Sequence, residues 1–78
     1  MEDLNLEYYN NLLQSIKIEE SNWRNKTSTN KHAFEFFKLK QSEIYFFLKN
    51  NKLSHLKLKM LSLANKVDKI IEEINAII

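Results

Sequence analysis

The sequence contains no cysteine, no glycine and no proline. Without cysteine, the chain can form neither a disulfide framework nor a metal site with thiolate ligands. The absence of glycine and proline argues against a β-sheet fold, because tight hairpin turns and many other β-turns depend on these two residue types. The composition therefore favours helices joined by polar turns, and it suits a reducing compartment.

Long apolar runs are also missing. The first residues, Met1-Glu2-Asp3-Leu4, are acidic and have no apolar core of a secretory signal peptide. No stretch approaches the roughly 18 uninterrupted apolar residues of a transmembrane helix. We therefore expect a soluble, cytoplasmic protein. At 78 residues, we expect residues 1–78 to form a single helical domain.

The last third of the chain carries the clearest positive pattern. Residues at alternating steps of three and four lie on one side of a helix, and helix–helix packing needs such an apolar seam. The pattern predicts a helix over residues 52–77 whose seam is covered by the rest of the chain or by another chain. The seam consists of Leu53, Leu56, Met60, Leu63, Val67, Ile70, Ile74 and Ile77.

Two further helices are predicted, over residues 3–22 and 31–49, with a polar loop at residues 25–30 between them. The seam loses its phase at Asn50–Asn51, which predicts a break before the third helix. One continuous helix is the alternative, because no glycine or proline interrupts the chain there. The predicted fold is all-α: a three-helix bundle, or a helical hairpin with an additional N-terminal helix, which self-associates.

The predicted second helix is apolar on two sides, and such a helix either lies between others or exposes one side to a partner. One stripe contains Phe34, Phe37, Ile44, Tyr45 and Leu48, and the other contains Phe36, Leu39, Phe46 and Phe47, interrupted by Glu43. We predict that the second stripe binds a partner protein, because aromatic side chains are typical interface anchors. The predicted partner-binding residues are Phe36, Leu39, Phe46 and Phe47 as anchors, with Lys40 and Glu43 setting the orientation.

Residue patterns for catalysis or metal binding are not found. His32 and His55 are the only histidines, and they fall on different predicted helices. Glu43 interrupts an aromatic stripe, but no second carboxylate lies within one helical turn of it. We therefore expect no enzyme activity, no metal, no cofactor and no small-molecule substrate.

Nucleic-acid binding is the main alternative, because the charge is unevenly placed. Residues 31–69 carry nine lysines against three acidic residues, a net charge of +6 in a chain whose total is +2. A DNA-associated protein would use Lys52, Lys57, Lys59 and Lys66 to contact phosphates. Against this reading, these residues are all lysine, whereas bidentate base recognition favours arginine.

Membrane association is the second alternative, since the third helix is amphipathic and basic in its first half. Small basic bundles that confer immunity to membrane-active peptides share this gross composition, but no motif assigns the chain to them. Helix-face binding to a protein accounts for more of the residues. We predict a small protein–protein interaction module, a regulator, inhibitor or adaptor that also forms homo-oligomers. Its ten asparagines, twelve lysines and arginines and eight isoleucines suggest an AT-rich coding background. This background, the small size and the absence of motifs suit a phage, plasmid or bacterial accessory protein.

Overall fold

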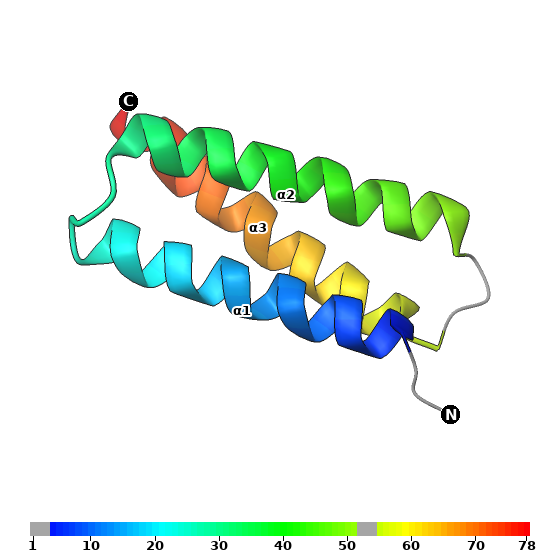
Figure 1. The fold of residues 1–78 in the computed structure, drawn as a ribbon. Coiled ribbons are helices and arrows are strands. Elements are labelled where there is room, and N and C mark those ends of the chain that lie inside the picture. Colours follow the sequence, from blue (N-terminus) through cyan, green and yellow to red (C-terminus); the bar gives the residue numbers. More distant parts are fainter. Residues whose placement is uncertain (1–3, 52–54) are drawn as a thin grey trace.

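The computed structural model describes residues 4–51 and 55–78 (Figure 1). Within these ranges the chain forms three α-helices, α1 (Leu4–Arg24), α2 (Asn30–Asn50) and α3 (Lys57–Ile77). Successive helices run in opposite directions, so the C-terminus lies at the end of the bundle where α1 turns into α2 (Figure 1). The predicted all-α three-helix bundle is confirmed.

The polar loop after α1 begins with a helix-ending motif that lacks the usual glycine. The Thr27 amide donates to the Asn22 carbonyl at 2.8 Å, and the Lys26 amide donates to the Trp23 carbonyl at 3.1 Å. This pair of bonds defines a Schellman motif, whose turning residue is left-handed. Lys26 takes that conformation, with φ 64°. The loop therefore turns sharply at a lysine, although the β-carbon of any residue other than glycine makes this left-handed conformation unfavourable.

Side chains hold this loop against both helices. The Trp23 indole donates to Asn30 Oδ1 at 2.8 Å, and the Ser28 hydroxyl donates to the buried Glu19 carboxylate at 2.5 Å. The Thr29 hydroxyl caps α2 by accepting a hydrogen bond from a backbone amide in its first turn. These bonds fix the corner between α1 and α2.

The predicted break between the second and third helices is also confirmed. α2 ends at Asn50 and α3 begins at Lys57. The side-chain amides of Asn50 and Asn51 donate to backbone carbonyls one turn earlier, at 2.8 Å and 3.0 Å. They satisfy acceptors that the end of a helix leaves unpaired. The sequence predicts that the third helix begins at residue 52. Residues 52–54 lie outside the described residues, and residues 55 and 56 form a turn, so α3 begins later than predicted.

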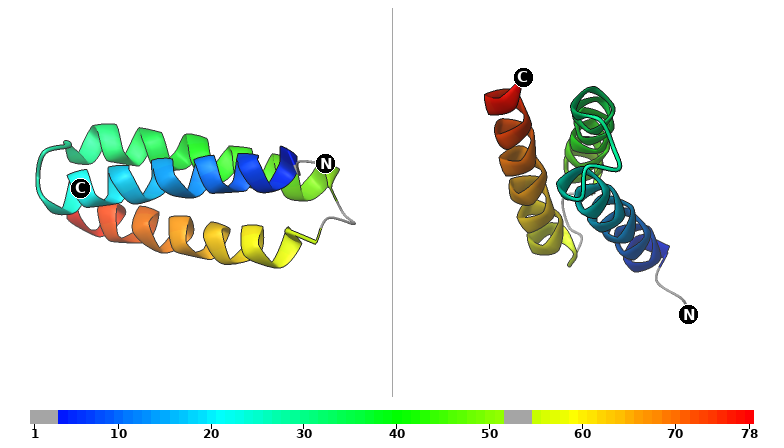
Figure 2. Two further views of the ribbon diagram at one scale, coloured as in Figure 1. Left: turned by 60° about the horizontal axis from the view of Figure 1, so that its bottom comes forward. Right: turned by 90° about the vertical axis from the view of Figure 1, so that its left-hand side faces the viewer.

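The apolar core lies mainly where α2 and α3 pack together, and α1 covers the seam between them (Figure 2). The predicted seam of α3 is buried from Leu56 to Ile74, whereas Leu53 lies outside the described residues. Ile77 and Ile78 are 62% and 71% exposed in the single chain. Fully buried side chains from all three helices meet in this core: Ile16, Phe37, Ile44, Met60, Val67 and Ile74.

Candidate functional site: the outer face of α2

One stripe of α2 faces away from both other helices. At 100° per residue its members stay within about 80° of the helix circumference, opposite the side of α2 that enters the core. They are spaced 4, 3, 4 and 3 residues apart, and all are exposed. We call these five residues the outer stripe: Glu35, Leu39, Ser42, Phe46 and Lys49.

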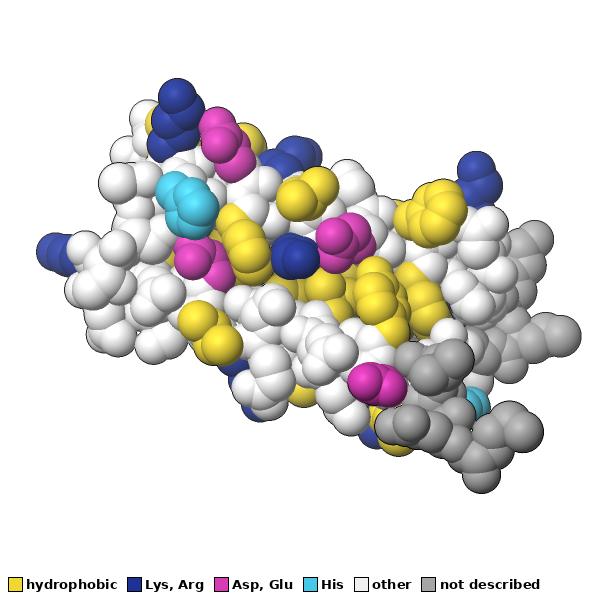
Figure 3. Space-filling model, in the orientation of Figure 1, with side chains coloured by type: hydrophobic (Ala, Val, Ile, Leu, Met, Phe, Trp, Pro, Cys, Tyr) yellow, Lys and Arg dark blue, Asp and Glu magenta, His cyan; other side chains and the backbone are white. Residues whose placement is uncertain are grey.

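The outer stripe carries two large apolar side chains that the bundle leaves uncovered. Leu39 is 59% exposed and Phe46 is 70% exposed. In Figure 3, separate apolar side chains stand out over α2, beyond those that line the junction between α1 and α2. Full burial of a leucine or phenylalanine is worth about 1.5–3 kcal/mol. A partner that covers both side chains would therefore gain several kcal/mol from this face.

The four predicted apolar anchors do not share one surface. Leu39 and Phe46 lie on the outer stripe, but Phe36 and Phe47 turn toward α1. Phe47 is 6% exposed and stacks on Tyr8, with ring centroids 5.8 Å apart. Phe36 is partly buried and meets the ring of the next residue edge to face at 5.4 Å. The structure therefore places Phe47 in the core and makes Phe36 part of the α1–α2 junction.

The two charged residues of the predicted site lie at the same junction. Lys40 Nζ is 3.4 Å from the Glu43 carboxylate and 5.2 Å from the centre of the Phe36 ring. The Lys40 side chain is only 18% exposed. Burial and the negative charge of Glu43 both raise the pKa of Tyr8, the α1 residue that stacks on this side of α2. Lys40 and Glu43 thus lie away from the outer stripe and compensate each other.

Sequence reasoning missed the polar members of the outer stripe. Glu35, Ser42 and Lys49 lie on the same face of α2 as Leu39 and Phe46. The signal was present, because these residues continue the 4–3 spacing through both apolar positions. It was hidden because a spacing rule applied to apolar residues alone passes over glutamate, serine and lysine.

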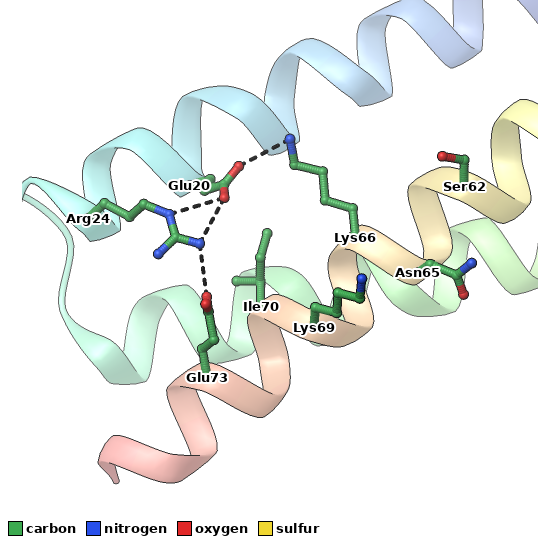
Figure 4. Close-up of a pocket in the computed structure, with 8 residues that line it drawn as sticks. All are labelled: Glu20, Arg24, Ser62, Asn65, Lys66, Lys69, Ile70 and Glu73. Carbon is green, nitrogen blue, oxygen red and sulfur yellow. Dashed lines mark hydrogen bonds and ion pairs between the residues drawn. The ribbon is translucent and has the colours of Figure 1, made fainter.

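A second candidate is the open groove of about 490 Å³ between α1 and α3 (Figure 4). Arg24 donates to Glu20 at 3.0 Å and to Glu73 at 2.8 Å, and Lys66 lies 3.2 Å from the other oxygen of Glu20. Two of these contacts join α1 to α3. The four charges compensate one another, so their role in this arrangement is to hold the two helices together.

The charged side chains in the groove shift each other's pKa values. Burial raises the pKa of Glu20, but the hydrogen bonds and positive charges of Arg24 and Lys66 outweigh burial and hold that pKa below its ordinary value. Hydrogen bonds to Glu73 and Glu20 raise the pKa of Arg24. Since the pKa of Glu20 is lower in the folded than in the unfolded chain, its ionised form stabilises the fold above the unfolded value of 4.5. That stabilisation is lost as the pH falls through the folded pKa.

The lysines of the nucleic-acid alternative do not gather on one surface in the described part of the chain. Lys66 belongs to the ion pairs of the α1–α3 groove, and Lys59 Nζ lies 5.7 Å from the centre of the Tyr9 ring of α1. Lys57 is exposed two residues before Lys59, and therefore on another side of α3. Lys52 lies outside the described residues.

Adjacent phenylalanines test which side of α2 is buried. Phe47→Ala should lower the free energy of unfolding by about 3 kcal/mol, because it empties a site in the core. Phe46→Ala should change it by less than about 0.5 kcal/mol at low micromolar concentration. Urea unfolding followed by circular dichroism measures both values. Equal losses for the two variants would contradict this orientation of α2.

The α1–α3 groove makes a pH-dependent prediction. Glu20→Gln should lower the free energy of unfolding at pH 7 by about 0.5–1.5 kcal/mol, since it removes the charge that pairs with Arg24 and Lys66. The difference from the native sequence should shrink as the pH is lowered from 7 toward 3, because Glu20 becomes protonated in the folded chain as the pH falls through its lowered folded pKa. Glu72→Gln, at an exposed position of α3, is the matched control and should have little effect at either pH. An equal loss at pH 7 and pH 3 would contradict the role given to the ionised carboxylate.

Other kinds of site find little support in the residues that the structure describes. Within residues 4–51 and 55–78, no three histidine, aspartate or glutamate side chains are grouped so that they could hold a metal ion. No helix in these same ranges is both long enough and apolar enough to cross a membrane. The chain matches no protein-family model, no curated protein and no solved structure.

Proposed function

We propose that this protein is a small helical protein–protein interaction module that recognises an apolar helix through the outer stripe of α2. It would act as a regulator, inhibitor or adaptor, without chemistry of its own. The observation that carries the proposal is the exposure of Leu39 and Phe46 on one face of a helix whose opposite face is already buried. Exposed aromatic and aliphatic side chains of this kind anchor protein interfaces.

The shape of the face supports a helical partner. Leu39 and Phe46 lie two turns apart, about 10 Å along the axis of α2. Ser42 stands between them, and its small side chain lets another helix approach closely. A small-molecule site, by contrast, is normally a concave cavity that encloses most of its ligand. The outer stripe is a convex face, which suits a helix lying alongside.

The two alternative functions have less support. For nucleic-acid binding, Lys59 and Lys66 face α1, and Lys66 is already paired with a carboxylate. For membrane association, the exposed large apolar side chains of α3 are Leu58, Leu61 and Ile77, at 78%, 39% and 62% exposure, and α3 has no aromatic residue to sit at the level of the lipid headgroups. The largest exposed aromatic surface belongs to Phe46 of α2.

Site-specific cross-linking tests the proposed function. A benzophenone amino acid at position 42 (Ser42→benzoylphenylalanine) should give a discrete protein adduct on irradiation in the cells that make this chain. The same replacement at Ser62 is the matched control, because Ser62 is an exposed serine on α3. The adduct should form at position 42 and not at position 62.

The captured protein must then bind in purified form. Its affinity should fall at least tenfold when Phe46→Ser removes an exposed anchor, because a single well-placed aromatic side chain is worth more than 1.4 kcal/mol. Lys57→Glu should leave the affinity unchanged. Adducts to nucleic acid, or equal protein adducts from both positions, would contradict the proposal.

A further inference from the structure

We infer that the helix recognised by the outer stripe is α2 of a second copy of this chain, lying antiparallel across a two-fold axis at Ser42. This inference rests on the proposed function and names its partner. Each apolar residue of the outer stripe then meets an apolar residue of the other copy, and each charged residue meets one of opposite charge. The surface complements itself, as an interface with two-fold symmetry requires.

The register follows from the spacing of the five residues. In an antiparallel pair centred on Ser42, residues before it on one copy face residues after it on the other. Leu39 is three residues before Ser42 and Phe46 is four residues after it, so each leucine packs against the phenylalanine of the other copy. Glu35 and Lys49 are both seven residues from Ser42, so each glutamate faces a lysine. The two-fold axis thus produces two apolar contacts and two ion pairs.

The charges favour this orientation over its alternative. A parallel pair would place Glu35 against Glu35 and Lys49 against Lys49, and like charges held opposite each other are unfavourable. Both side chains are exposed, and no hydrogen bond or ion pair within the described ranges engages either of them. They are therefore free to pair between copies. The charge pattern argues for a second copy in the antiparallel sense.

The bundle leaves room for this approach. Both α1 and α3 pack against the opposite side of α2, whose buried residues include Phe37 and Ile44. At the centre of the stripe, Ser42 is small enough for two helix axes to come within the usual 8–10 Å. The same pairing leaves the α1–α3 groove and the lysines of α3 outside the interface.

Charge reversal tests the pairing by sedimentation equilibrium of the full chain. Glu35→Lys or Lys49→Glu alone turns both ion pairs into repulsions, because the two-fold axis doubles each change. Each single variant should dimerise about tenfold more weakly than the native sequence. The double variant restores opposite charges and should dimerise like the native chain, and an equimolar mixture of the two single variants should do the same. These differences should diminish at high salt.

Matched controls separate a local effect from a change in net charge. Glu72→Lys and Lys17→Glu make the same charge changes at exposed positions of α3 and α1, and should leave dimerisation unaltered. Phe46→Ser should abolish the dimer and leave helicity intact. Equal weakening by the control variants, or failure of the double variant to recover, would overturn the inference.

The experiment also distinguishes the inference from the proposed function. A chain that stays monomeric at every concentration would overturn self-pairing. If position 42 then captured a different protein in a Phe46-dependent manner, the proposed function would stand with another partner. A dimer that survives Phe46→Ser would also overturn the inference, because it would use a different face. Loss of every protein adduct at position 42 would overturn both.

Discussion

The bundle depends on how α2 distributes its apolar side chains. Large apolar residues surround most of this helix, and two neighbouring helices can cover only one side of it. The core cluster takes Ile44 and Phe47 from α2, Tyr8 of α1 stacks on Phe47, and Phe36 packs against the cluster. Leu39 and Phe46 remain outside because they lie opposite the centre of the buried side. The exposed face is therefore a direct consequence of packing three helices around an aromatic one.

Apolar packing and ion pairs have different roles in holding the three helices. α2 and α3 meet along an apolar seam with Asp68 at its edge, which accepts hydrogen bonds from Gln41 and Tyr45. α1 is attached to α3 partly through Arg24, which bridges Glu20 and Glu73. Exposed ion pairs are individually weak and sensitive to salt. The α1–α3 ion pairs should thus respond more to pH and ionic strength than the buried apolar seam between α2 and α3. This division leaves the outer face of α2 independent of the charges that hold α1.

Local patterns in the sequence predicted much of the fold. The 3–4 spacing from Leu56 to Ile74 identified the buried side of α3, because that side is apolar at every step. The apolar spacing of the third helix does not continue backward through Asn50–Asn51, and this loss of phase identified the end of α2.

The candidate site was harder to predict, because it depends on where other helices lie. Both stripes of α2 look equally apolar in sequence, and the buried side takes Phe37 and Ile44 from one and Phe47 from the other. Only the positions of α1 and α3 decide that Phe46 is exposed while Phe47 is not. Glu35 and Lys49 can be identified as the charged ends of the outer stripe only when the positions of α1 and α3 are known.

Intermolecular NMR contacts between Leu39 and Phe46 test the central claim most directly. Within one α2 the two residues are about 10 Å apart along the helix axis, too far for a strong nuclear Overhauser effect. In a mixture of isotope-labelled and unlabelled chains, antiparallel pairing predicts strong contacts between the Leu39 methyl groups of one copy and the Phe46 ring of the other. Contacts of Leu39 with Leu39 and of Phe46 with Phe46, or no intermolecular contact at millimolar concentration, would contradict it.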